Sequence, residues 1–94
     1  MVLTIRFIGS LRASSKKSKL TLELEQTVVL KQVVKKIVQG QPKLKRALID
    51  PELDDPRTNV LMLVNWKEIS VLDGLETKLK DGDELVFIPV VHGG

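Results

Sequence analysis

Apolar and polar side chains alternate in two segments near the start of the chain. Leu3, Ile5 and Phe7 are separated by polar residues, and residues 20–24 repeat the pattern with three leucines. A period of two is typical of strands that bury one face, so the two segments are predicted to form a β-hairpin. Their connection, residues 9–19, contains four serines and four basic residues and is predicted to be a polar, mobile loop.

The period then changes to that of a helix with one apolar face. Apolar side chains recur three and four positions apart at Leu30, Val33, Val34, Ile37 and Val38. This stripe predicts a helix that packs on the sheet, with Thr27 as its N-cap and Gly40 in the C-cap position. Pro42 suits the first position of a second, short helix that continues over residues 43–49.

A loop and a second hairpin are predicted in the middle of the chain. Residues 50–57 contain two prolines and four acidic side chains, which indicates a loop. Residues 60–64 form an uninterrupted apolar run, as is typical of a strand covered at least partly on both faces. A short return strand over residues 67–71 would pair with it across Asn65 and Trp66, and we expect Trp66 to fold over the core.

The last predicted strand, residues 84–90, follows a turn signal at Asp81-Gly82 and is apolar on both faces. Because the first and last strands are both hydrophobic, we expect them side by side and parallel in the middle of the sheet. The predicted fold is α+β, a β-grasp with a mixed sheet of four to five strands, one main helix and one short helix. Residues 1–90 would form this domain and residues 91–94 a flexible Gly-Gly tail.

Composition excludes several classes of chemistry. The chain of 94 residues has no cysteine and one histidine, His92. Disulfides, thiolate metal sites, cysteine nucleophiles, histidine triads and multi-histidine metal sites are therefore excluded, and the sequence does not indicate an enzyme. No apolar run approaches the ~20 residues of a membrane span, and no signal peptide is evident. We therefore expect a cytoplasmic protein without a membrane partner.

The net charge of +3 is compatible with an acidic partner but does not favour nucleic acid. Proteins that stack on bases interleave aromatic and basic residues. This chain has only Phe7, Trp66 and Phe87 as aromatic residues, and the two phenylalanines lie in predicted strands, where Phe87 is expected in the core. The lysines are interpreted as a solvated surface.

Residues 79–88 (LKDGDELVFI) lead towards Gly93-Gly94 at the end of the sequence. This joined motif resembles the C-terminal region of the β-grasp sulfur carriers and ubiquitin-like modifiers. The terminal His-Gly-Gly, together with residues 63–69 (LVNWKEI) and 7–11 (FIGSL), is similar to the ubiquitin-related modifier.

Two features depart from those patterns. Residues 89–91 (PVV) resemble the tail of the molybdopterin synthase small subunit and of the archaeal small modifiers more closely than that of the ubiquitin-related modifier. The tail also lacks the arginines that precede the last glycines of ubiquitin, which argues against a ubiquitin-type activation cascade.

The resemblance implies a carrier that is the substrate of an enzyme and not itself an enzyme. A ubiquitin-activating-enzyme-like protein would adenylate the Gly94 carboxylate, with ATP and magnesium used by that enzyme and no cofactor bound by this chain. Gly94 and Gly93 suit this role because residues without a Cβ can pass through a narrow channel. Contacts with the activating enzyme or a partner are assigned to His92, Val91, Val90 and Pro89.

Two of these contact residues also have simpler interpretations. His92 is equally compatible with a solvated position in the tail. Pro89 lacks an N–H group, and ending the pairing of the last strand is the role we prefer for it.

The acyl-adenylate would have two possible products. Sulfur transfer gives a thiocarboxylate that would donate sulfur, with tRNA thiolation as the preferred pathway, and attack by a target-protein lysine gives an isopeptide bond. An alternative is the molybdopterin synthase small subunit, which would donate sulfur in molybdenum cofactor biosynthesis. An alternative of another class is a basic β-grasp module that binds RNA, with the glycines incidental.

Overall fold

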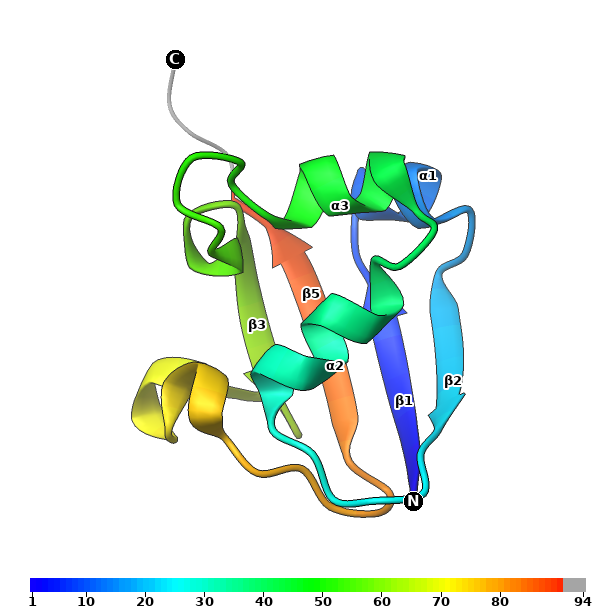
Figure 1. Cartoon of the computed structure of the whole chain (residues 1–94), viewed down its shortest axis with the longest axis vertical. Helices are drawn as coiled ribbons and strands as arrows, with labels where there is room; N and C mark the ends of the chain where they lie inside the picture. The colour runs from blue at the N-terminus through cyan, green and yellow to red at the C-terminus, as the bar shows by residue number, and fades with distance from the viewer. Residues whose placement is uncertain (91–94) are drawn as a thin grey trace.

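The computed structural model describes residues 1–90 as a mixed sheet with helices packed on one face (Figure 1). The five strands lie in the order β2-β1-β5-β3-β4. The strands are β1 (Val2–Phe7), β2 (Lys19–Glu23), β3 (Val60–Val64), β4 (Lys67–Glu68) and β5 (Glu84–Pro89). The helices are α1 (Leu11–Ser15), α2 (Leu30–Ile37) and α3 (Pro42–Leu48), with 3-10 turns η1 (Pro56–Thr58), η2 (Ile69–Val71) and η3 (Gly74–Glu76).

The first and last strands occupy the centre of the sheet, as the sequence predicts. β1 and β5 pair in parallel, with Ile5 opposite Leu85 and Phe7 opposite Phe87. β1 also pairs antiparallel with β2, and β5 pairs antiparallel with β3. Parallel neighbours need a long connection, which here includes all of the helices and the other three strands. The predicted α+β fold with a mixed sheet is confirmed.

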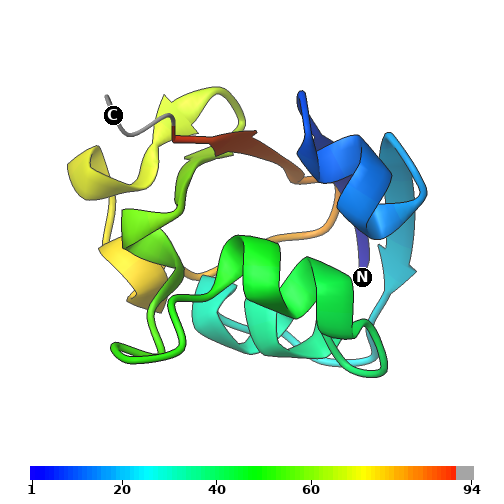
Figure 2. The same ribbon diagram turned by 90° about the horizontal axis from the view of Figure 1, so that it is seen from above.

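The core lies between the sheet and α2. Alternation along β1 directs Leu3, Ile5 and Phe7 towards the helix layer, where each is at most 2% exposed. The apolar stripe of α2 faces them, because residues three and four apart share one side of a helix. Figure 2 shows α2 and α3 along one side of the molecule, with the strands of the sheet across from them. The second helix is confirmed, with Pro42 in its first turn.

A short helix replaces part of the predicted loop over residues 9–19. α1 begins at Leu11, whose side chain is 2% exposed and belongs to the core. Burial of this single leucine favours an ordered turn, and α1 packs beside α3. The prediction of an irregular loop was wrong here because serine and lysine content describes the exposed side of the segment only.

The predicted caps of α2 were also wrong. Val29, not Thr27, is the N-cap, and its N–H donates to Oε1 of Gln32 at 3.0 Å. The chain stays extended up to this point because Leu30 N–H donates to the Thr77 carbonyl oxygen at 2.9 Å. At the other end the C-cap is Val38, and Gly40 takes a left-handed φ of +68° two residues later.

The return strand is shorter than predicted. β4 contains only Lys67 and Glu68, and η2 follows immediately. Glu68 accounts for this change, since its carboxylate accepts a hydrogen bond from the Ser70 N–H at 2.7 Å and caps the 3-10 turn. Within residues 1–90, no helix is long and apolar enough to cross a membrane.

Candidate functional site

The end of β5 is the last described point before the predicted site. Pro89 lies opposite Val60 and is the last residue of the strand, as expected from its missing N–H. The prediction that Pro89 ends the pairing is wrong by one residue, because Val90 N–H donates to the Asn59 carbonyl oxygen at 2.9 Å. Val90 is thus the anchored base of the tail. Predicted site residues Val91, His92, Gly93 and Gly94 lie outside the described residues.

The turn after β1 contacts the end of β5 from the side opposite β3. Ile8 N–H donates to the Phe87 carbonyl oxygen at 3.0 Å, which extends the parallel pairing towards the end of β5. Gly9 follows with a φ of +59°, and a Cβ at this position would lie 3.4 Å from Cγ of Pro89. The absence of a side chain at Gly9 therefore lets the β1–α1 turn lie against the Pro89 ring.

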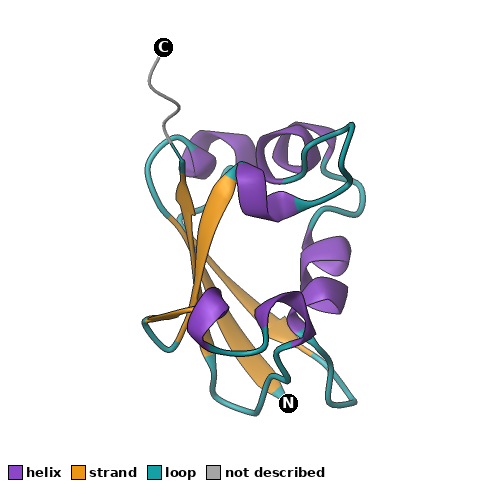
Figure 3. Cartoon of the chain, turned by 90° about the vertical axis from the view of Figure 1, so that its left-hand side faces the viewer, coloured by secondary structure: helices purple, strands orange, loops and turns teal. Residues whose placement is uncertain are grey.

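The face of the sheet opposite the helices carries an apolar patch beside this anchor. Figure 3 shows α2 and α3 on one side of the sheet. The outer-face patch, as we name it, consists of Leu61, Leu63, Val86 and Ile88. Leu61 pairs with Ile88 and Leu63 with Val86, so the four side chains are direct neighbours on the two strands. Leu61 is 39% exposed, whereas Val86 is fully covered.

An ion pair borders the outer-face patch. Arg6 Nε donates to Oε2 of Glu84 at 2.7 Å across the β1–β5 pair. This hydrogen bond holds the pKa of Glu84 below its ordinary value, and desolvation opposes the effect. Arg6 lies opposite Val86 in the register, so the aliphatic part of Arg6 is placed to cover that valine.

Trp66 lies at the opposite end of β3 from Val60. Asn65 and Trp66 both have positive φ, +50° and +67°, as a two-residue hairpin turn requires. The Asn65 side chain fixes the turn, since its Nδ2 donates to Oδ1 of Asp83 at 2.9 Å and its Oδ1 accepts from Glu84 N–H at 3.0 Å. The expectation that Trp66 folds over the core is wrong, because its side chain is 64% exposed.

The described part of the site is built on the paired strands β3 and β5. It joins an anchored strand end to an adjacent apolar surface, and residues 1–90 contain no group of three or more His, Cys, Asp or Glu side chains placed to hold a metal ion. From the sequence we expect that the sheet face not covered by the helix can dock partners, but the residues that line it could not be named, because they come from two strands whose register no local pattern specifies. The available signal in the sequence was the run of residues 60–64, in which the residues on both faces of the strand are apolar.

Comparison with known proteins agrees with this arrangement. The model of the ThiS family matches residues 5–94. No curated protein matches the chain. Small archaeal modifier protein 1 (SAMP1) from Methanosarcina acetivorans has a similar solution structure, with a TM-score of 0.84 and 26% identity over 99% of this chain and 96% of that one.

Two further solved structures are similar. Urm1 from Trypanosoma brucei gives a TM-score of 0.77 and 28% identity over 99% of this chain and 95% of that chain. A protein–protein complex of subunits 1 and 2 of molybdopterin-converting factor from Helicobacter pylori 26695 contains a chain with a TM-score of 0.64 and 26% identity, covering 100% of both chains. With the family model matching nearly its whole length, the chain belongs to the ThiS family of ubiquitin-like sulfur carriers and modifiers.

Proposed function

We propose that this protein carries sulfur as a thiocarboxylate on Gly94 and that the same activated terminus can be conjugated to protein lysines. A free carboxylate is ionised near neutral pH and is a poor acylating agent, so it must first be activated. An activating enzyme would join it to the α-phosphate of ATP with release of pyrophosphate. A sulfur nucleophile or a lysine amine would then displace AMP from the acyl-adenylate.

The observation that carries the proposal is the anchorage of Val90 at the end of the central strand. The backbone is held up to Val90 by its bond to Asn59, and residues 91–94 follow in sequence. Four residues can span at most ~14 Å when fully extended. That length is enough to carry Gly94 into a pocket of another protein while the folded domain remains outside it.

The outer-face patch supports the same function. Leu61 is exposed and Ile88 is half-buried, and both lie on the two strands whose paired ends hold Pro89 and Val60. An activating enzyme that covers this patch would fix the direction in which the tail leaves the domain. Docking on the patch would therefore contribute binding energy at a distance from the reacting carboxylate, which is used to position it.

Mass spectrometry of the protein recovered from its own cells tests the proposal. Replacement of one terminal oxygen by sulfur on Gly94 is the expected result, and branched peptides joining Gly94 to target lysines are expected for conjugation. A variant lacking Gly93 and Gly94 should fold normally, lose both products and lower the thiolation of cellular tRNA. A free, unmodified carboxylate in the presence of ATP and the cell's activating enzyme would contradict the proposal.

A second candidate function is that of the small subunit of molybdopterin synthase. The similarity to a chain in the molybdopterin-converting factor complex and the PVV sequence of residues 89–91 favour it. This function requires stable association with a large catalytic subunit. Co-purification of such a subunit, together with loss of molybdenum cofactor on deletion of this protein, would support it over tRNA thiolation.

A further inference from the structure

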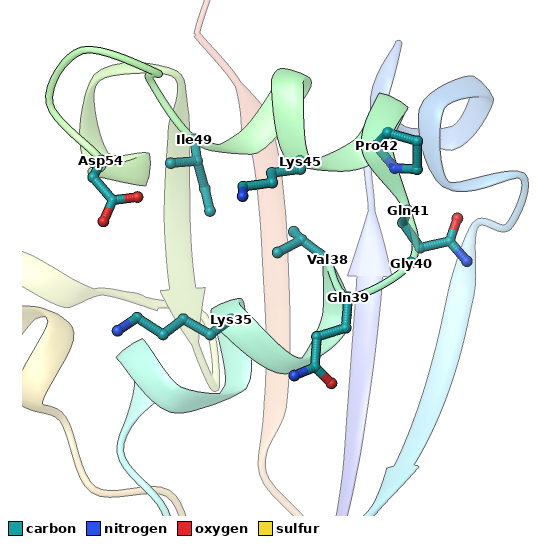
Figure 4. Close-up of a pocket in the computed structure, with 9 residues that line it drawn as sticks. All are labelled: Lys35, Val38, Gln39, Gly40, Gln41, Pro42, Lys45, Ile49 and Asp54. Atoms are coloured by element: carbon teal, nitrogen blue, oxygen red, sulfur yellow. The ribbon is translucent and has the colours of Figure 1, made fainter.

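A groove runs along α2 on the helix side of the molecule, remote from the outer-face patch. Its main part is a hollow of about 540 Å³ between α2 and α3 (Figure 4). A smaller hollow of about 40 Å³ continues it towards Pro56 and Leu75. The two share Lys35, Ile49 and Asp54 as lining residues, so they form one continuous surface, which we name the α2–α3 groove.

The base of the α2–α3 groove is apolar. Val34 and Val38 come from α2 and the residue after it, and Ile49 comes from the end of α3. These side chains are buried by the fold but still line the hollow. An extended segment lying in the groove would therefore cover their remaining surface with apolar side chains of its own.

The rims of the α2–α3 groove are positively charged. Lys31 and Lys35 stand on α2, and Lys45 stands on α3 across the hollow, whereas Asp54 is the acidic lining residue. Figure 4 shows Lys45 beside Ile49 on the α3 side of the hollow, with Lys35 and Val38 on the α2 side. Within residues 1–90, the ion pairs are Arg6–Glu84 and Arg57–Asp55, so none of these three ammonium groups has an ion-pair partner there.

On the two helices the sequence strengthens this positive field, whereas the loop at residues 50–55 contains four acidic residues, of which Asp54 lines both hollows. Residues 26–49, which include both helices, contain six basic residues and no aspartate or glutamate. Like charges gathered on one layer attract an acidic partner and raise the rate at which it is encountered. The same field would attract nucleic acid, but none of the described residues that line the groove is an aromatic residue that could stack on a base.

We propose that the α2–α3 groove binds an extended acidic and apolar peptide segment of a partner protein. From Lys31 to Gln39 the axis of α2 and its extension rises by about 12 Å, which matches about four residues of extended chain. Lys31 and Lys35 are about 6 Å apart along the axis, and alternate side chains of an extended peptide are about 6.6 Å apart. Two acidic residues separated by one apolar residue therefore fit the two lysines.

This binding site does not depend on activation of the tail. The groove lies on the helix layer, whereas the outer-face patch lies on the opposite face of the sheet. A partner bound in the groove would leave the patch uncovered. The groove could therefore select the acceptor or target protein while the tail is delivered elsewhere, and its failure would leave the sulfur-carrier proposal intact.

Fluorescence anisotropy with the full chain and a fluorescein-labelled peptide, Val-Glu-Leu-Glu-Val, tests the proposal. We expect saturable binding with a Kd on the order of 100 µM at low salt. The matched peptide Val-Gln-Leu-Gln-Val should bind at least about tenfold more weakly, because it keeps the apolar contacts but lacks the charges. Amide chemical-shift changes should map to α2, α3 and residues 49–56.

Two charge-reversed proteins separate the groove from general electrostatics. The double substitution Lys31→Glu/Lys35→Glu should lower peptide affinity at least about tenfold, whereas the exposed control Lys17→Glu/Lys19→Glu should change it less than about threefold. Equal losses in both variants would overturn the proposal. So would the absence of saturation below about 1 mM, or shift changes confined to the outer-face patch.

A single-stranded oligouridine probe provides the remaining comparison. A peptide site is supported if the Lys31→Glu/Lys35→Glu variant loses peptide binding. In that case oligouridine should bind weakly, and both charge-reversed variants should weaken its binding equally. Oligouridine binding that depends on Lys31 and Lys35 while the acidic peptide fails to bind would overturn the proposal and assign the groove to RNA.

Discussion

Phe7 and Phe87 lie opposite each other in the parallel β1–β5 pair, with their ring centroids 5.9 Å apart and the ring planes tilted by 44°. Both rings are almost fully buried. The contact joins residues that are 80 positions apart in sequence, and Phe87 precedes Pro89 by two residues. The position of the tail base is therefore coupled directly to the packing of the core.

Truncation of this contact should strongly destabilise the fold. Phe87→Ala removes a buried ring and leaves a cavity, which typically lowers the free energy of unfolding by ~3–5 kcal/mol. Val71→Ala is the control, because Val71 is 73% exposed and its truncation should change stability by no more than ~0.5 kcal/mol. Urea denaturation measures both values. Similar values for the two variants would contradict the central role of β5.

The exposed turn tryptophan gives a different expectation. Trp66→Ala should cost less than ~1 kcal/mol because the side chain is mostly exposed, whereas loss of a core tryptophan costs ~3–5 kcal/mol. Trp66 also has a φ of +67°, a region in which residues with a Cβ are strained. Trp66→Gly should therefore be more stable than Trp66→Ala by ~1 kcal/mol. Thermal unfolding of the two variants provides the comparison, and the reverse order would contradict the turn geometry.

Under the proposed function, the outer-face patch should affect docking with an activating enzyme more than the chemical step. Leu61→Asp places a charge in the patch and is expected to raise the KM for this protein at least about tenfold in ATP–pyrophosphate exchange, with kcat little changed. Leu53→Asp makes the same chemical change on the 50–55 loop, where Leu53 is 63% exposed. Its KM should remain close to that of the unmodified protein. A matching rise in both variants would remove the patch from the docking surface.

Acid should weaken the fold partly through Glu84. The hydrogen bond from Arg6 lowers the pKa of Glu84 in the folded state. A carboxylate whose pKa is lower in the folded state stabilises the fold at every pH above its pKa in the unfolded chain, about 4.3. This contribution is lost as the pH falls through the lower pKa of the folded state. Glu84→Gln should therefore lose less stability than the unmodified protein between pH 6 and pH 3. Urea midpoints across this range measure the difference.

Glu25→Gln is the matched control for the pH experiment. Glu25 is exposed and has no ion-pair partner within residues 1–90. Its removal should leave the acid-dependent loss of stability close to that of the unmodified protein. If Glu25→Gln and Glu84→Gln had the same pH profile, the Arg6–Glu84 pair would not contribute to acid sensitivity.

The elements that could be predicted share a repeating local signal. Alternation at Leu3, Ile5 and Phe7 and the helical stripe from Leu30 to Val38 indicate which face of each element is buried. α1 could not be predicted in the same way, because a single buried residue, Leu11, orders five residues within a polar segment. The start of α2 was missed because residues 28–30 pair with residues 77–79, which are distant in sequence.

By itself, the sequence determined the order of the strands and of α2 and α3, the central position of β1 and β5, and the Gly93-Gly94 residues on which the proposed chemistry depends. These follow from residue type and local period, which are properties of neighbouring positions. Only the tertiary structure decided that Val90 is held by Asn59, that Leu61 and Ile88 form one patch, and that Lys35 and Lys45 face the same groove. Each of these depends on strand register or helix packing, which brings together residues that no local pattern relates.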